Sequence, residues 1–140
     1  MDNRVVFTNG CFDLFHIGHL RFLKEAKTMG TSLIVGINSD ESVRRIKGRG
    51  RPIFPVEQRV EIIQSLWFVD GIVVFEEDDP LKLIKKIKPD VLVKGDSWAE
   101  KDIIGGEFVK SKGGKIVRIP LVKDISTSRI IEAIISENSL

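Results

Sequence analysis

Residues 4–19 of the chain, RVVFTNGCFDLFHIGH, indicate which fold to expect. The first six residues of this stretch are rich in branched apolar side chains, which is typical of a strand. A glycine follows the strand, and residues 17–29 then carry apolar side chains at helical spacing until Gly30 stops the helix. A strand, a glycine turn and a helix in this order form the repeating unit of α/β folds with a parallel sheet.

The rest of the chain repeats this alternation. Its strand-like runs are continuously apolar, as expected of strands buried on both faces of a sheet. We therefore predict one doubly wound, Rossmann-like α/β domain over residues 1–140, with a five-stranded parallel sheet. Trp67 and Phe68 are expected in its core, and Trp98 in the core or at an interface. The further strands are expected at residues 32–38, 71–75, 90–93 and 115–119, and the further helices at residues 40–46, 55–68, 80–87 and 126–135.

Composition and charge argue against several classes of protein. Of the 140 residues, 42% are hydrophobic and 30% charged, and 22 basic against 20 acidic side chains leave a net charge of +2. A balance so near zero gives no bulk attraction to nucleic acids or membranes. Apolar runs as short as residues 72–75 cannot span a bilayer, the single Cys11 cannot form an internal disulfide, and the N-terminus lacks a signal-peptide layout. We expect a cytoplasmic domain without a nucleic-acid or membrane partner.

Two histidines mark the start of the first predicted helix. His16 and His19 are three residues apart and share one side of that helix, with Gly18 leaving room for a ligand. The free N–H groups of a helix N-terminus favour an anion, and two imidazoles add donors aimed at the same phosphate. The alternatives are an incidental pair or a metal pair. Zinc needs three or four nitrogen or sulfur ligands, and the chain has no other histidine. The pattern therefore favours a phosphate site.

Basic residues follow the second and fourth predicted strands, where ligands bind to sheets of this kind. Lys47 and Arg51 belong to a glycine-punctuated basic loop, for which the plain alternative to phosphate contact is a solvated face. Lys94 can neutralise phosphate charge at the end of the fourth strand, or it is a surface lysine. Gly95 allows a ligand to approach. Asp96 suits a magnesium ion, a sugar hydroxyl or a turn cap, and the sequence leaves these open.

A hydroxyl-rich turn precedes the last predicted helix. Ser126 is a good N-cap, whose side chain bonds free helix N–H groups. The alternative is a second helix N-terminus offered to phosphate, with Arg129 reaching back toward it. The residues by themselves do not decide between the two interpretations.

Residues 10–19, GCFDLFHIGH, resemble the signature of the cytidylyltransferase-like nucleotidyltransferases. Members of that superfamily transfer a nucleoside monophosphate from a nucleoside triphosphate to a phosphorylated acceptor and release pyrophosphate. Residues 47–52, 55–59 and 75–80 look like one branch, the D-glycero-β-D-manno-heptose 1-phosphate adenylyltransferases, which make ADP-heptose for lipopolysaccharide. Residues 94–98, KGDSW, also resemble glycerol-3-phosphate cytidylyltransferases.

The resemblance implies ATP and a sugar phosphate as substrates, with Mg²⁺ on the phosphates. Branch members are often fused to a sugar kinase domain, and we expect a separate kinase to supply the sugar phosphate to this domain. The resemblance also implies a homodimer, by analogy with relatives. Ser128 stands where the branch usually has threonine, and it keeps the hydroxyl. The implied acceptor-binding residues are Asp13, Lys47 and Arg51. The implied nucleotide-binding residues are Asn9, Gly10, Cys11, Phe12, His16, Gly18, His19, Lys94, Gly95, Asp96, Ser126, Thr127, Ser128 and Arg129.

The expected reaction is a direct, in-line attack of the acceptor phosphate on the α-phosphorus of ATP. No base partner is evident for Cys11 or for any serine, so no covalent enzyme intermediate is expected. Catalysis then rests on positioning and on stabilisation of the developing charge. The residues expected to stabilise it are His16, His19, Lys47, Lys94 and Arg129.

Three other functions stay open at this point. A glycerol-3-phosphate cytidylyltransferase and an FAD synthase-like adenylyltransferase share the histidine loop. A catalytically silent nucleotide-binding module would share the fold without the reaction. The presence of both histidines, both lysines and the hydroxyl-rich turn argues against the silent module.

Overall fold

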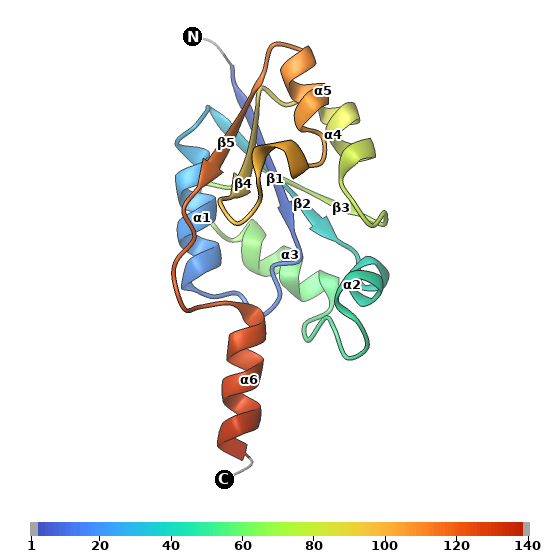
Figure 1. Ribbon diagram of the computed structural model, residues 1–140, viewed down its shortest axis with the longest axis vertical. Coiled ribbons are helices and arrows are strands. Elements are labelled where there is room, and N and C mark those ends of the chain that lie inside the picture. The colour runs from blue at the N-terminus through green and yellow to red at the C-terminus, as the bar shows by residue number, and fades with distance from the viewer. Residues whose placement is uncertain (1–2, 139–140) are drawn as a thin grey trace.

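The computed structural model describes residues 3–138, and its centre is an all-parallel sheet (Figure 1). The strands are β1 (Val5–Gly10), β2 (Ser32–Asn38), β3 (Gly71–Phe75), β4 (Val91–Gly95) and β5 (Lys115–Ile119). Their order across the sheet is β3-β2-β1-β4-β5, so the direction of winding reverses between β1 and β4. The predicted doubly wound α/β fold with five parallel strands is confirmed.

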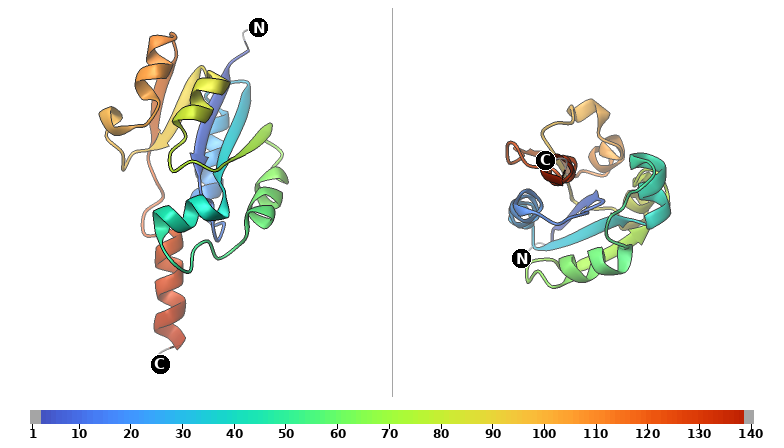
Figure 2. Two further views of the ribbon diagram at one scale, coloured as in Figure 1. Left: turned by 90° about the vertical axis from the view of Figure 1, so that its right-hand side faces the viewer. Right: turned by 90° about the horizontal axis from the view of Figure 1, so that it is seen from below.

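Helices cover both faces of the sheet (Figure 2). The helices are α1 (Ile17–Lys27), α2 (Asp40–Lys47), α3 (Val56–Gln64), α4 (Leu81–Ile87), α5 (Gly106–Ser111) and α6 (Thr127–Asn138), with a 3₁₀ turn η1 (Glu100–Asp102). The sequence pattern predicts neither η1 nor α5, because elements this short do not show a helical period. Within residues 3–138, no helix is both long and apolar enough to cross a membrane.

The core consists of two apolar clusters, one on each face of the sheet. Val6 of β1 packs in the cluster that contains Leu23 of α1 and Ile63 of α3, whereas its neighbour Phe7 packs in the cluster that contains Ile84 of α4. Successive side chains of a strand point to opposite faces, and both of these are fully buried. Burial on both faces explains why the strands are continuous apolar runs.

Trp67 departs from the sequence expectation. Its side chain is 83% exposed, whereas the neighbouring Phe68 is 3% exposed and belongs to the core cluster of α1 and α3. The helix α3 ends at Gln64, so its helical spacing does not continue to position 67. The next residue turns inward instead, and the prediction of a buried Trp67 is wrong.

The last helix, α6, projects away from the sheet beyond the carboxyl ends of the strands (Figures 1 and 2). Ser126 precedes it, and the Ser126 hydroxyl accepts a hydrogen bond from the backbone N–H of Arg129 at 3.1 Å, which confirms the predicted N-cap. The Thr127 hydroxyl donates to the backbone oxygen of Asp13 at 2.6 Å. The start of α6 is therefore joined to the loop between β1 and α1.

Candidate functional site

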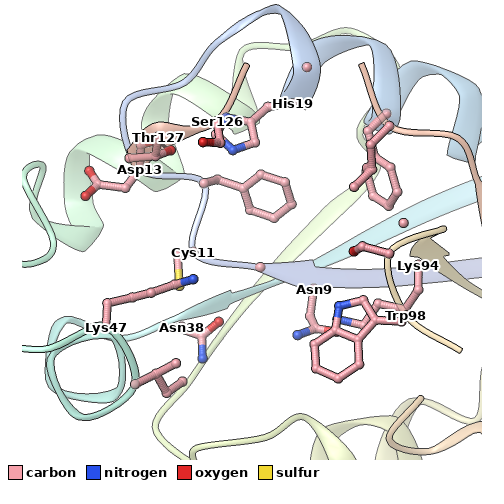
Figure 3. A pocket seen from close by; sticks show the side chains of 18 of the residues that line it. Asn9, Cys11, Asp13, His19, Asn38, Lys47, Lys94, Trp98, Ser126 and Thr127 are labelled. Carbon is pink, nitrogen blue, oxygen red and sulfur yellow. Dashed lines mark hydrogen bonds between the residues drawn. The ribbon is translucent and has the colours of Figure 1, made fainter. Parts of the chain in front are cut away.

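A cavity of about 560 Å³ opens at the ends of β1, β2 and β4, where the winding reverses (Figure 3). Both its place and its size are typical of a small-molecule site in an α/β fold. Among the residues predicted for the site, Asp96 and Arg129 do not line it. Those that do are Asn9, Gly10, Cys11, Phe12, Asp13, His16, Gly18, His19, Lys47, Arg51, Lys94, Gly95, Ser126, Thr127 and Ser128.

His16 and His19 lie at the N-terminal end of α1, and both line the cavity. His16 is the N-cap, and its Nδ1 accepts a hydrogen bond from the backbone N–H of Gly18 at 3.1 Å. The Nδ1 of His19 accepts one from the backbone N–H of His16 at 3.2 Å. A backbone donor at Nδ1 places the proton of a neutral imidazole on Nε2. The two rings stack with 3.7 Å between centroids, so the cavity wall carries a pair of Nε2–H donors.

Burial keeps this pair uncharged at neutral pH. Desolvation, with a smaller effect of the His16 charge, lowers the pKa of His19 to about 3. Desolvation also lowers the pKa of His16 below its usual value. The pair therefore presents N–H donors and carries no positive charge at neutral pH.

Gly18 positions His16. A Cβ at residue 18 would lie 2.8 Å from Cε1 and 3.0 Å from Nδ1 of the His16 ring, which is closer than real side chains approach. The ring thus occupies the space that the sequence analysis assigns to an approaching ligand. The glycine is needed for the imidazole to reach the N–H group of residue 18.

Asp13 holds the loop between β1 and α1 in place. Its buried carboxylate accepts hydrogen bonds from the backbone N–H groups of Ile53 at 2.6 Å and Phe54 at 2.9 Å. The preceding Phe12 has a left-handed φ of 52°, which is costly for a residue with a side chain and persists only where the surroundings enforce it. Because both carboxylate oxygens bind backbone N–H groups, Asp13 acts on the site through the basic loop that it fixes.

Arg59 of α3 is an important residue that the sequence analysis missed. Its guanidinium is fully buried and donates to the backbone oxygens of Phe54, Cys11 and Asn38 at 2.8–2.9 Å. It also pairs with the carboxylate of Asp40 at 2.8 Å. These partners belong to the loop before α3, the end of β1, the end of β2 and the start of α2. One side chain therefore joins four segments that surround the cavity.

The side of the cavity nearest α4 and α5 carries a cation next to an aromatic ring. The Lys94 ammonium lies 5.7 Å from the centre of the Trp98 ring. Burial lowers the pKa of Lys94 to about 8, so it is still mostly protonated at neutral pH. Trp98 is 48% exposed and lines the cavity, so it does not belong to the core.

Cys11, directly after β1, and Lys47, at the end of α2, face the same cavity (Figure 3). Burial raises the pKa of the Cys11 thiol, and this effect exceeds the opposing charges of Lys47 and Arg59. The thiol is therefore protonated at neutral pH. A protonated thiol is a poor nucleophile, which supports a reaction without a covalent enzyme intermediate.

Arg129 and Asp96 do not line the cavity, and each has a partner of its own within the chain. The guanidinium of Arg129 lies 3.9 Å from the carboxylate of Asp124 and is 63% exposed. The Asp96 carboxylate accepts a weak hydrogen bond from the backbone N–H of Leu121 at 3.4 Å, which favours the turn-capping role among the three left open. Within residues 3–138, no three histidine, cysteine or acidic side chains gather as metal ligands, so the donor set does not fit a metal held by the protein alone.

The family model described as cytidylyltransferase-like matches residues 7–133 of the chain. Two curated relatives are called bifunctional protein HldE. The relative from Alcanivorax borkumensis is 48% identical over 94% of this chain, and the relative from Pelobacter propionicus is 45% identical over 97% of it. In each case the match covers 28% of the relative, so the chain spans little more than a quarter of their length.

Solved structures agree with this assignment. A lipopolysaccharide core biosynthesis protein from Thermoplasma volcanium superposes with a TM-score of 0.73 at 31% identity, over 86% of this chain and 98% of that one. A pantothenate synthetase from Thermus thermophilus superposes with a TM-score of 0.59 at 14% identity, over 99% of this chain and 67% of that one, and shows the shared fold alone. With its paired histidines at the end of α1, the chain belongs to the cytidylyltransferase-like family and is a nucleotidyltransferase.

Proposed function

We propose that the chain transfers AMP from ATP to heptose 1-phosphate, giving ADP-heptose and pyrophosphate. The observation that carries the proposal is the stacked, neutral histidine pair at the N-terminus of α1. Preorganised N–H donors in a partly buried site stabilise charge that develops on a transferred phosphoryl group. The relative described as a lipopolysaccharide core biosynthesis protein supports a sugar phosphate as acceptor.

The triphosphate lies between the N-termini of α1 and α6 in this proposal. His19, Ser126 and Thr127 lie on one side of the segment that leaves β1 (Figure 3). Helix N-termini bind phosphate through free N–H groups and the helix dipole. Lys47 and Arg51 line the same cavity and supply positive charge to it.

The chemical step is a displacement at phosphorus. An oxygen of the acceptor phosphate attacks the α-phosphorus of ATP in line with the bond to the α,β-bridging oxygen. That bond breaks, and its electron pair leaves with pyrophosphate. The acceptor phosphate is already ionised near neutral pH, so no general base is needed. The contribution of the protein is to orient the two substrates and to stabilise the transition state.

Mg²⁺ enters as part of the Mg–ATP substrate, held by phosphate oxygens and water, which is its usual coordination at nucleotides. Heptose 1-phosphate comes from a sugar kinase that this domain does not contain. The relatives of more than three times this length, which are called bifunctional, support a partner activity of that kind. We place the reaction in the cytoplasm, where ATP is made.

Pyrophosphate release in the presence of Mg²⁺ tests the proposal. ATP and CTP are each combined with heptose 1-phosphate, glycerol 3-phosphate and flavin mononucleotide. We expect release only from ATP with heptose 1-phosphate. Release from CTP with glycerol 3-phosphate, or from ATP with the flavin, refutes the proposed substrates and leaves the family intact. Binding of ATP without release in any combination refutes the proposed reaction in favour of a silent nucleotide-binding module.

A further inference from the structure

We propose that Trp98 is the platform on which the sugar ring of the acceptor stacks, in a subsite completed by Asn9 and Lys94. This inference rests on the proposed function, because it names the residue that distinguishes a sugar phosphate from other phosphorylated acceptors. It moves Asn9 and Lys94 from the nucleotide, where the family resemblance places them, to the acceptor.

Strand alternation separates this subsite from the histidine pair. Phe7 and Leu92 are paired between β1 and β4, and both pack toward α4 and α5. Asn9 and Lys94 are two residues further along each strand, so they point to the same face. Trp98 follows β4 on the way to α5. Figure 3 shows all three of these cavity residues on one side of the segment leaving β1, opposite the imidazole of His19.

In-line displacement fits an acceptor site that lies on the side of the cavity opposite to the histidine pair. The attacking oxygen approaches the α-phosphorus from the side opposite to the departing pyrophosphate. With the triphosphate between the starts of α1 and α6, the acceptor approaches across the end of β1. The cavity wall on that side is formed by the segment that carries Lys94 and Trp98.

The chemistry of the three side chains suits a sugar phosphate. The Lys94 ammonium binds a phosphate, and 5.7 Å from it to the ring centre leaves a sugar attached to that phosphate within reach of the indole. The indole is about half exposed and lines the cavity, where the apolar C–H face of a pyranose can cover it. The Oδ1 of Asn9 is buried and has no donor among the described residues. A sugar hydroxyl is a donor that would satisfy it.

Steady-state kinetics of Trp98→Ala and Trp98→Phe tests the platform. We expect Trp98→Ala to raise the KM for heptose 1-phosphate by roughly 3- to 10-fold, the usual effect of one aromatic contact. The KM for ATP should not change, and Trp98→Phe should recover most of the loss. Inhibition by glycerol 3-phosphate, which has no ring, should be the same in wild type and Trp98→Ala. A rise in the KM for ATP instead would overturn the proposal, because the indole would then stack on adenine.

The chain offers a matched control in Trp67, its second tryptophan, which is exposed and does not line the cavity. Trp67→Ala should leave both KM values unchanged. Trp67→Phe leaves Trp98 as the single tryptophan, and its emission should change on titration with heptose 1-phosphate in the presence of an ATP analogue with an α,β-methylene bridge. In Trp98→Phe the remaining tryptophan is Trp67, and its emission should not change in the same titration. An equal response in both proteins would overturn the proposal.

The two measurements separate this inference from the proposed function. If the wild type does not turn over heptose 1-phosphate but the emission of Trp98 responds to it, the proposed function fails and the subsite stands. If the wild type turns over heptose 1-phosphate, but Trp98→Ala has an unchanged KM for it and the emission of Trp98 does not change on titration, the proposed function stands and the subsite is wrong.

Discussion

At the scale of single residues, the two histidines cap the helix with one ring nitrogen and keep the other for the proposed contact with phosphate. Each Nδ1 accepts a hydrogen bond from the backbone of the first turn of α1, which leaves each Nε2–H for a phosphate. His16 and His19 are therefore part of the helix cap and of the proposed catalytic site together. The two roles can be separated, because asparagine places an oxygen near the position of Nδ1 and nothing near Nε2.

We predict that His16→Asn lowers kcat by about 10²–10³-fold, the usual effect of losing one preorganised donor. The Asn side chain still accepts from the N–H of Gly18, and asparagine is a good N-cap, so the free energy of unfolding should change little. Pyrophosphate release and urea unfolding give the two quantities. A loss of stability that matches the loss of activity would contradict the separation of roles.

His19 should also make the fold sensitive to acid. Its pKa is about 3 in the folded protein and near 6.5 when unfolded, so between these values the unfolded chain binds more protons. Stability is therefore highest above pH 6.5 and falls as the pH drops toward 3, by up to about 1.4 kcal/mol per pH unit for one such group.

The variant His19→Asn tests this sensitivity, because it keeps an acceptor for the N–H of His16 and does not titrate. Urea unfolding of the wild type and the variant at pH 7 and pH 5 should show a smaller loss of stability in the variant. An identical loss in both proteins would mean that His19 is already protonated in the fold.

At the scale of elements, α3 holds the cavity together although none of its residues lines it. Its Arg59 guanidinium bonds the backbone ends of β1 and β2 and the carboxylate at the start of α2. Backbone oxygens at the ends of strands have no partner within the sheet. The buried Arg59 satisfies two of them, at Cys11 and Asn38, and the backbone oxygen of Phe54 in the loop before α3, with one rigid fork of donors.

Arg59→Met should lower the free energy of unfolding by about 3–5 kcal/mol, because it leaves one buried and two partly buried carbonyl oxygens without donors. The surface variant Arg45→Met is a matched control. Arg45 pairs with Asp78 at 2.7 Å and donates to the backbone oxygen of Glu76, but it is exposed to solvent. Its loss should have a far smaller effect in the same urea titration, and equal effects would contradict the role of Arg59.

At the scale of the whole molecule, the site is built from segments that are far apart in the chain. The loop after β1, the basic loop after α2, the end of β4 and the start of α6 all line one cavity. Asp13, in the loop after β1, is hydrogen-bonded to two of the other segments. Its carboxylate accepts from the backbone N–H of Ile53, and its backbone oxygen accepts from the hydroxyl of Thr127. A ligand that bridges these segments should stabilise the entire fold.

We predict that Mg–ATP raises the unfolding temperature by several degrees, because saturation at 100 times Kd adds about 2.7 kcal/mol to the folded state. His16→Asn, which lacks one phosphate donor, should show a smaller shift at the same concentration. Thermal unfolding followed by circular dichroism measures both. A shift of equal size in the two proteins would place the triphosphate away from α1.

Much of the fold and of the candidate site was predictable because both follow from local pattern. Branched apolar runs identified the strands, and a strand followed by glycine and paired histidines predicted a site at the strand end where the cavity lies. Arg59 had a visible signal as well, since it lies three residues after Val56 and four before Ile63, on the buried face of α3. Its partners could not be named, because they are backbone atoms in other segments of the chain.

The sequence by itself determined the order of elements, the parallel sheet and the residue types at the strand ends, since these depend on periodicity and composition. Only the tertiary structure decided how those residues act. Burial makes His19 a neutral donor, the His16 ring fills the space beside Gly18, and Arg129 lies outside the cavity. Trp67 and Trp98 have the same side chain, yet one faces solvent and the other lines the cavity. Each difference depends on which distant segments surround a side chain, and long-range packing decides that.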